Sequence, residues 1–464
     1  MKKIFLSIIV PSLLIFNSCK KFIDVNNDPN VPIDVNESLI LSPAELDIAH
    51  VVASGFDFYL VNHWMQNVSL NQPIPNHGTY QLFNNELDGD WSNLYTTCIN
   101  NLQQIIKKAE AAGNSSYAGI GKVLTAFSLG TGTDLWGDLP YSQAFQGASE
   151  FRPAYDKQED IYKNIQSLLD DAITNLKAAT GTVPGSDDLF YGGDLDKWIR
   201  LAYTLKARYY LHLTKAPGYS ASTQADLALT ALQNGMQSND DDLAFVYPGS
   251  AGQENPWYGT FHPVSTLMLS EHLVEGFKTR NDPRLTTMVA PAQTTGLYTG
   301  LPIGTASSGY YQLESYSRPG AFYGAADATL YVVNYTEALF LKAEATLIKS
   351  GYTAAEPVYD EAIMAHMNKL NVNASDAAAY ISSRTLTVSN ALSLIIEEKS
   401  IANYLSVENF NDWRRTGYPV LIKVPNGLTT EIPRRFLYPE IERISNPQTI
   451  QSAKITDRVW WDQP

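Results

Sequence analysis

Apolar residues recur every three to four positions over several long stretches of the chain, which is the spacing of one buried helix face. Between residues 196 and 213, Trp198 and Leu205 belong to such a face. Similar stretches occupy residues 332–347 and 392–405. The pattern therefore predicts a mainly α-helical protein.

The helical stretches come in pairs that are separated by short turns, as in helical-repeat proteins. Small residues let two helix axes approach closely, and an aromatic ring fills the gap between neighbouring repeats. Ala343, Ala355, Tyr359 and Ala362 have this small–aromatic spacing, although Thr346 departs from it. We therefore expect a tetratricopeptide-like scaffold over residues 43–236 and 331–406. The earlier pairs are expected at 43–66 with 90–112, 116–130 with 157–178, and 196–213 with 223–236.

Residues 238–330 have a different character, because proline and glycine interrupt every apolar run in them. Long irregular segments inside compact proteins are usually functional or disordered. This segment is also rich in tyrosine, which favours an ordered structure. We expect it to be a loop-rich ligand region, and we expect residues 411–464 to be irregular as well.

The first eighteen residues have the features of a secretory signal peptide. Lys2 and Lys3 precede an apolar stretch over 4–16 that is too short to span a bilayer, and no other stretch looks long and apolar enough. Cys19 then follows Ser18, which resembles a bacterial lipobox, although Phe16 stands where leucine is usual. We expect a signal peptide at 1–18, acylation of Cys19 and a tether over 19–37. A simple secretory signal with a chance cysteine is the alternative.

Composition and charge exclude one class of partner and suggest another. The chain has 464 residues and a net charge of −15, whereas nucleic-acid binding needs clustered Lys and Arg. It also holds 27 Tyr and 8 Trp, whose flat rings can serve as platforms for ligands. Cys98, the other cysteine, falls within a helical pattern and is expected to be a buried free thiol.

The motifs of common enzymes are missing from the sequence. It has no H-E-x-x-H and no G-x-S-x-G, and its seven histidines lack metal-ligand spacing. The acidic runs 240–242 and 88–90 lack EF-hand spacing and are expected to be solvated turns. We therefore predict no cofactor, no metal and no catalysis. A glycoside hydrolase needs only two carboxylates, so among 48 Asp and Glu that alternative stays open.

Several longer motifs follow one another along the chain. They are DLWGDLPY at 134–141, DKW at 196–198 leading to LKAR at 205–208, NDPRL at 281–285, EALFLKAEA at 337–345, EEK at 397–399, NDWRRTG at 411–417 and PRRFLYP at 433–439. In this order they resemble the SusD/RagB-like family of outer-membrane nutrient-binding lipoproteins. The resemblance runs from the lipobox to the last tryptophans of the chain and is closest to the second branch of the family, the starch-binding associated type.

The resemblance implies one SusD-like domain over residues 38–464, with a tetratricopeptide-like scaffold and a loop-rich ligand region. It also implies a lipid-anchored protein at the cell outer membrane, exposed on the surface, that captures an oligosaccharide and delivers it to a SusC-like TonB-dependent transporter. Peptides or another nutrient could replace the oligosaccharide. A surface glycoside hydrolase and a helical-repeat adaptor without a small ligand are the rival functions.

The candidate binding residues follow by elimination among the aromatic side chains. Five of the eight tryptophans lie in the family motifs, and Trp91 begins a predicted core helix, which leaves Trp64 and Trp257. Trp257 lies between turn-forming residues and is the preferred platform, with loop packing as its alternative. The further candidates, in the loop-rich region and in a polar loop near Asn76, are Tyr258, Tyr298, Tyr310, Tyr311, Tyr316 and Tyr80.

Charged residues inside the motifs are expected to be structural. Arginine forks pair well with carboxylates and with backbone carbonyls between helices. A basic binding site is the alternative. The residues concerned are Glu344, Asp412, Arg414, Arg415, Arg434 and Arg435.

Overall fold

The structure, a computed structural model, describes residues 35–261, 266–305, 310–449 and 452–464. The predicted signal peptide, Cys19 and most of the tether lie outside these ranges. Helices dominate the described chain, as predicted. They are α2 (Ser38–Asp47), α3 (Phe56–Trp64), α4 (Asp88–Asn93), α5 (Asn100–Ala111), α6 (Ser115–Trp136), α7 (Gln158–Ala178), α8 (Leu195–His212), α9 (Ala221–Leu232), α10 (Pro256–Phe261), α11 (Glu271–Thr279), α12 (Leu285–Met288), α13 (Ala321–Gly324), α14 (Tyr335–Ser350), α15 (Tyr352–Lys369), α16 (Ala374–Ser382), α17 (Ala391–Ala402), α18 (Glu408–Thr416) and α19 (Glu440–Ser445).

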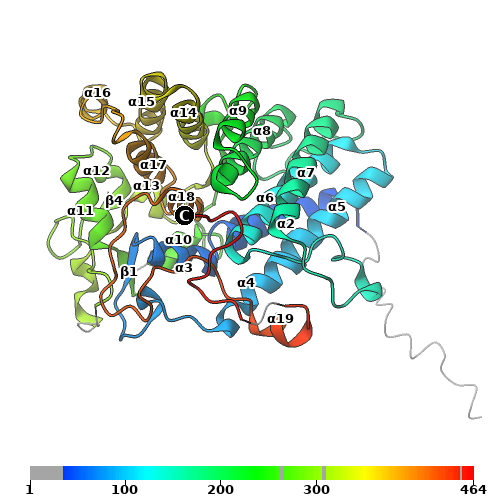
Figure 1. The fold of residues 1–464 in the computed structure, drawn as a ribbon, viewed down its shortest axis with the longest axis horizontal. Helices are drawn as coiled ribbons and strands as arrows, with labels where there is room; N and C mark the ends of the chain where they lie inside the picture. The colour runs from blue at the N-terminus through cyan, green and yellow to red at the C-terminus, as the bar shows by residue number, and fades with distance from the viewer. Residues whose placement is uncertain (1–34, 262–265, 306–309, 450–451) are drawn as a thin grey trace, which may run out of the picture.

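The long helices form one continuous arc (Figure 1). Each packs against the next in the order α5, α6, α7, α8, α9, α14, α15, α16. The α9–α14 contact joins the two predicted blocks of repeats, although about a hundred residues of chain separate them. The segment between them leaves the arc and lies against its open side. The predicted pairs at 116–130 with 157–178 and at 196–213 with 223–236 are confirmed, and they belong to a single array, whereas the predicted helix at 43–66 is broken at residues 53–55.

The pair α14–α15 has the packing that its spacing predicts. Ala343 and Ala355 are fully buried, and Tyr359 fills the space between the helices beside Phe340, with ring centroids 6.3 Å apart. The predicted start of α14 was too early, because Val332 and Val333 extend as a strand. Asn334 then caps the helix by accepting a hydrogen bond from the Glu337 N–H at 2.9 Å.

The loop-rich segment is more ordered than its composition suggests. Besides α10 to α13 it contains short strands in three two-stranded antiparallel sheets, β1–β3, β2–β6 and β4–β5. In the first of these, Val68 pairs with Leu269, so the segment is tied to the N-terminal part of the chain. The strands are β1 (Val68–Leu70), β2 (Leu243–Phe245), β3 (Leu267–Leu269), β4 (Val289–Ala290), β5 (Arg318–Pro319) and β6 (Leu330–Val333).

The stretch Ser38–Trp64 corrects one sequence expectation. By length and composition alone, its 27 residues are long and apolar enough to cross a membrane. The sequence analysis expected no such stretch after residue 16. Core helices of soluble proteins pass the same test. Here the stretch is broken at residues 53–55, and Leu41, Ile48 and Leu60 are fully buried in the hydrophobic core.

The motif arginines are structural, as predicted. Arg415 joins α18 to α14 through Glu344, and its Nη2 also contacts Asp412 at 2.6 Å. Arg434 pairs with Asp462 at 2.6 Å. Arg414 and Arg435 instead donate to backbone carbonyls.

The acidic run at 240–242 is not a solvated turn, which corrects another expectation. Asp241 and Asp242 are buried and pair with Arg200 at 2.8 Å and with Lys369 at 2.5 Å. Cys98 is a buried free thiol, as predicted, and burial raises its pKa to about 12.

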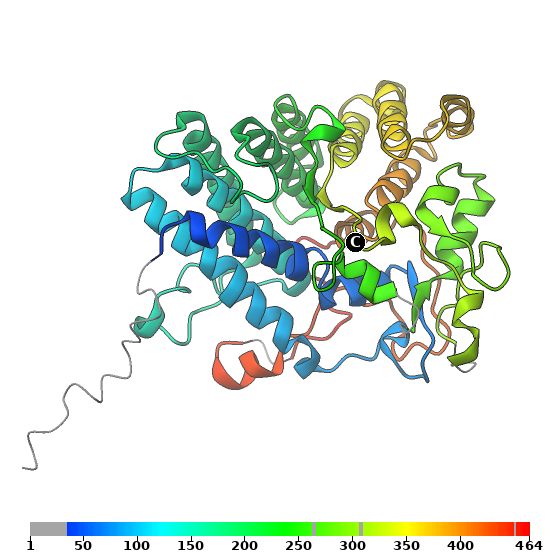
Figure 2. The same ribbon diagram turned by 180° about the vertical axis from the view of Figure 1, so that it is seen from behind.

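The end of the chain lies in the middle of the molecule, and the view from behind places it there too (Figures 1 and 2). The Trp461 side chain is fully buried, and its Nε1 donates a hydrogen bond to the Asp134 carboxylate at 3.0 Å. The irregular C-terminal segment thus completes the core that the arc surrounds.

Candidate functional site

A cavity of about 230 Å³ opens between α10, the β4–β5 pair and α13, and we call it the Tyr258 pocket. Its walls combine aromatic rings and prolines with a few polar groups, the usual composition of small-ligand sites. The residues that line it are Tyr258, Phe261, Ala290, Pro291, Gln293, Tyr316, Arg318, Pro319 and Gly324.

The β4–β5 pair positions one wall of the pocket. Ala290 lies opposite Arg318 in the antiparallel register. The Gly320 N–H then donates to the Met288 carbonyl at 2.9 Å. A side chain at Gly320 would clash with the Thr287 carbonyl oxygen, so the close approach of these segments requires glycine there.

Helix α10 positions the opposite wall. Asn255 anchors its start, accepting from the Trp257 N–H at 2.8 Å and donating to the Ala328 carbonyl at 2.9 Å. This directs the Trp257 ring into the core, where it stacks on Phe58 with ring centroids 5.1 Å apart. The next side chain, Tyr258, is only half-buried and lines the pocket.

The structure brings together two of the predicted site residues, Tyr258 and Tyr316. Tyr316 packs on one side against the small cluster of Met268, Leu301 and Leu313 and remains half-buried. Tyr316 and Tyr258 therefore line the same cavity. An aromatic pair of this kind suits the apolar face of a sugar ring, and phenol hydroxyls can bond to sugar hydroxyls.

Three other candidates lie in the hydrophobic core. Trp64 is 1% exposed between Phe410 and Phe436, and Trp257 and Tyr80 are each 4% exposed. A ring that is covered on both sides offers no face to a ligand, so their geometry favours the packing role that had been the alternative for Trp257. The sequence could not reveal which of two adjacent rings, 257 or 258, faces inward.

The remaining candidates do not join the pocket as far as the structure describes them. Tyr298 is half-buried and packs against the main core. Tyr310 and Tyr311 lie in the short 3₁₀ helix Tyr310–Ser315, and their side chains are outside the described part of the structure.

Arg318 and Gln293 are site residues that the sequence reasoning missed. Arg318 precedes Pro319 and Gly320, a turn signal inside the tyrosine-rich stretch, and that was the available clue. Burial lowers the pKa of the Arg318 guanidinium, and the Glu314 carboxylate opposes this shift. The charge is therefore held in a partly desolvated wall of the pocket.

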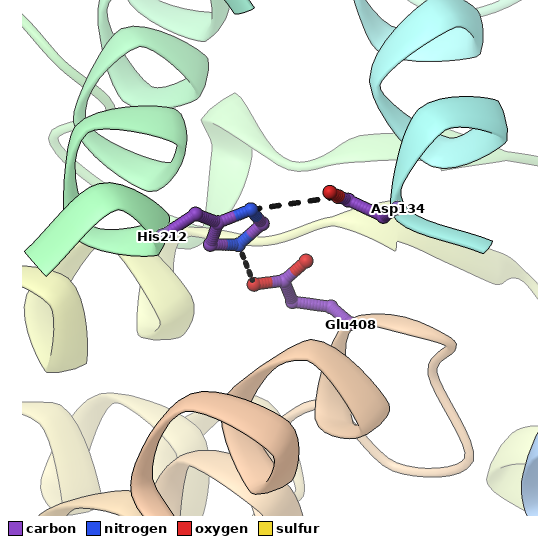
Figure 3. Close-up of side chains that lie close together, drawn as sticks. All are labelled: Asp134, His212 and Glu408. Atoms are coloured by element: carbon purple, nitrogen blue, oxygen red, sulfur yellow. Dashed lines mark hydrogen bonds and ion pairs between the residues drawn. The ribbon is translucent and has the colours of Figure 1, made fainter. Parts of the chain in front are cut away.

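A second candidate is the buried cluster of Asp134, His212 and Glu408, from α6, α8 and α18 (Figure 3). His212 Nε2 lies 2.8 Å from a Glu408 oxygen, and Nδ1 lies 3.4 Å from an Asp134 oxygen. Burial works against charge on the imidazole, but the two carboxylates outweigh it and raise the pKa of His212 to about 9. In the metal-free cluster the ring is thus an imidazolium at neutral pH, with a proton on each nitrogen, and a metal could bind only by displacing one of these protons.

The same cluster lacks room for a hydrolytic reaction. The cavity beside Asp134 and Glu408 is about 30 Å³, on the order of one water molecule. Asn411 and Trp461 also donate to Asp134, at 3.1 and 3.0 Å. The cluster is therefore a buried charge bridge between three helices.

A larger cavity, about 730 Å³, lies between α11, α17 and residues 418–422. Most of its charged groups are already paired: Arg280 with Glu397 at 3.0 Å and Glu275 with Lys278 at 2.6 Å. None of the predicted site residues lines it. The Tyr258 pocket is accordingly the stronger candidate for ligand capture.

Comparison with known proteins gives a family match and a common fold. Residues 29–439 match the family described as starch-binding and associating with the outer membrane. No curated protein matches the sequence.

Solved structures match the fold over nearly the whole chain. A chitin-binding SusD homologue from Flavobacterium johnsoniae is 24% identical, with a TM-score of 0.80, and the match covers 92% of this chain and 98% of the other. A SusD/RagB family protein from Bacteroides thetaiotaomicron is also 24% identical, with a TM-score of 0.79 and coverage of 92% and 99%. At this identity the likeness establishes the architecture alone.

Proposed function

The chain belongs to the SusD-like family of starch-binding proteins that associate with the outer membrane, and from this premise we propose that it captures an oligosaccharide in the Tyr258 pocket. The observation that carries the proposal is the convergence of Tyr258 and Tyr316 on one cavity of about 230 Å³. That space suits one sugar residue of a longer chain, with its neighbours held along the pocket rim.

The same proposal includes an anchor and a partner. Acylation of Cys19 would hold the protein at the outer membrane, and a SusC-like TonB-dependent transporter would receive the ligand. The support for these points is the lipobox-like Ser18-Cys19 and the order of the family motifs. An anchor that confines both proteins to one membrane raises their effective concentration, so a modest affinity is enough to keep them together.

The proposed role is capture without cleavage. The described pocket walls contain no carboxylate, whereas glycoside hydrolysis uses a pair of them beside the scissile bond. The buried pair Asp134 and Glu408 is held by His212 and is closed to a substrate of that size. Binding chemistry is therefore what this pocket supports.

The test is calorimetric titration of the full chain, purified in detergent, with oligosaccharides from starch and chitin and with short peptides. Tyr258→Ala should weaken oligosaccharide binding about 10-fold, because it removes a stacking surface. Tyr298→Ala is the matched control, since Tyr298 has similar exposure but does not line the pocket.

The outcomes separate the rival functions. Peptide binding that is lost in Tyr258→Ala, without sugar binding, would replace the glycan by a peptide ligand. Release of shorter sugars during the titration would favour a hydrolase. Equal affinity of Tyr258→Ala and the unchanged chain would remove the pocket from the proposal.

A further inference from the structure

Arg318 has no partner for its charge within the described structure. Its Nε and Nη2 atoms are buried, and neither makes a hydrogen bond. The side chain as a whole is half-buried, but two of its donor atoms are removed from water without a hydrogen bond, and polar groups in that position are usually bonded. The position of this guanidinium on a pocket wall points to a partner that arrives with the ligand.

Other buried arginines in the described part of the chain show how this fold normally satisfies the group. Arg208 makes two hydrogen bonds of 2.7 Å to Glu337. Arg284 pairs with Asp282 at 2.7 Å and with Glu398 at 2.6 Å. Arg280 and Arg414 each leave one nitrogen unpaired but bond through the others. Arg318 differs because it has no such bond.

Arg318 is also the sole charged residue among those that line the Tyr258 pocket. Glu314 acts on it electrostatically but is exposed and makes no ion pair with it. The protein as a whole carries a charge of −15, so an anion would be repelled from most of its surface. An unpaired arginine that lines the same cavity as two aromatic side chains is what makes this pocket favourable for an anionic sugar.

Resting on the capture role proposed above, we infer that the ligand carries an anionic group, a sugar carboxylate or a sulfate ester, which Arg318 binds while Tyr258 and Tyr316 contact the ring. The planar guanidinium matches two oxygens of such a group with parallel hydrogen bonds. A neutral glucan or chitin chain would leave the Arg318 charge unpaired. The preferred ligand class is therefore acidic oligosaccharides.

The experiment titrates the full chain in detergent, at low salt, with three oligosaccharides of equal length: oligogalacturonate, a sulfated oligogalactan and neutral oligogalactan. We expect at least one anionic sugar to bind about 10-fold or more tighter than the neutral one. Arg318→Gln should lower the affinity for that anionic sugar by roughly 10- to 100-fold and leave the affinity for the neutral sugar unchanged. The anionic sugar that binds identifies the source of the charge.

Two control variants complete the design. Arg152→Gln removes an exposed arginine that has no ion pair in the described structure and should leave all three affinities unchanged. Arg318→Lys keeps the charge but loses the fork, so its affinity for the anionic sugar should fall between those of the unchanged chain and Arg318→Gln. Thermal unfolding of each variant checks that the fold is intact, and removal of an unpaired charge should not lower the midpoint.

The result that would overturn the inference is equal binding of neutral and anionic sugars, or an equal loss of both in Arg318→Gln. A neutral sugar that binds as tightly as the anionic ones, with a loss in Tyr258→Ala but none for any sugar in Arg318→Gln, would contradict the charge inference while the capture role stands. Binding of none of the three sugars would overturn the inference, and failure with the starch and chitin oligosaccharides as well would overturn the capture role.

Discussion

His212 is a charged bridge at the point where three helices meet. It lies between Asp134 of α6 and Glu408 of α18, and Tyr162 of α7 places its hydroxyl 2.9 Å from Nδ1. The imidazolium lies between two buried carboxyl groups, and although burial alone would raise the pKa of Glu408, its charge helps to hold that pKa well below the usual range. The stability of the arc is therefore coupled to one proton.

This proton makes the stability of the protein sensitive to alkaline pH. The pKa of His212 is about 9 in the folded chain against 6.5 for an ordinary histidine. Its stabilising contribution is fully present below pH 6.5 and is lost as the pH rises through 9. The unfolding midpoint should fall between pH 7 and 10 by on the order of 5 °C from this group.

An NMR titration of the imidazole resonances checks the cause directly. His212 should titrate with a midpoint near 9, whereas His63, whose pKa burial lowers to about 3, should show no protonation above pH 5. A His212 midpoint at or below 6.5 would contradict the charge bridge.

Single residues were the hardest features to predict from the sequence. Tyr258 and Tyr316 were candidates and do line a common pocket, but Trp257, beside Tyr258, turns into the core. Neighbours in a six-residue helix have the same local composition, so only the tertiary partner, here Phe58, decides which ring is covered. Arg318 was missed for the same reason, because its lack of a partner is visible only in three dimensions.

At the scale of elements, buried ion pairs join helices that are distant in the sequence. Arg415 of α18 contacts Glu344 of α14 and Asp412 of its own helix. All three side chains are at most 2% exposed. The ion pair between Arg415 and Glu344 therefore holds α18 against α14 of the arc.

Truncation of this arginine should be strongly destabilising. Arg415→Ala would leave Glu344 and Asp412 as buried charges with fewer partners, so the free energy of unfolding should fall by about 3–5 kcal/mol. Denaturant titration measures this loss. Lys349→Ala is the matched control, because it breaks the exposed pair with Asp226 and should cost about 1 kcal/mol or less. Similar losses of unfolding free energy in both variants would show that the buried Arg415 pairs stabilise the fold no more than an exposed ion pair does.

Helices were predictable from the sequence and strands were not. The long helices carry their own signal, since a buried face repeats within the element, as in α8 and α14. Strands β1 and β3 have three residues each and lie about two hundred residues apart. A strand this short has too little sequence pattern to predict the distant strand with which it pairs. Val332 and Val333 were assigned to a helix although they belong to β6, because the pairing of this strand with β2 is nonlocal.

At the scale of the whole molecule, the helical array encloses a segment that carries the candidate site. Contacts between α9 and α14 close the array behind the inserted residues 238–330. The scaffold is built of long packed helices, whereas the inserted segment consists of short helices, short strands and loops, so the candidate site lies on loops that a regular frame supports.

The proposed anchor predicts where the whole protein is found in the cell. Cys19→Ser should move it from the membrane fraction to the soluble fraction, because acyl chains supply the membrane affinity. Fractionation of cells followed by mass spectrometry of the N-terminal peptide measures both location and acylation. Membrane retention of Cys19→Ser without acylation would contradict the anchor and point to a protein partner.

The burial of Trp461 has a consequence for biogenesis. The ring occupies the centre of the arc and bonds to Asp134, more than three hundred residues earlier in the chain. Domains otherwise fold from the N-terminus as synthesis proceeds. Here the contact between Trp461 and Asp134 forms only after residue 461 has left the ribosome, so this part of the core is completed last. For the outer-membrane location proposed above, such late completion would leave the chain time to reach the export machinery before its core is finished.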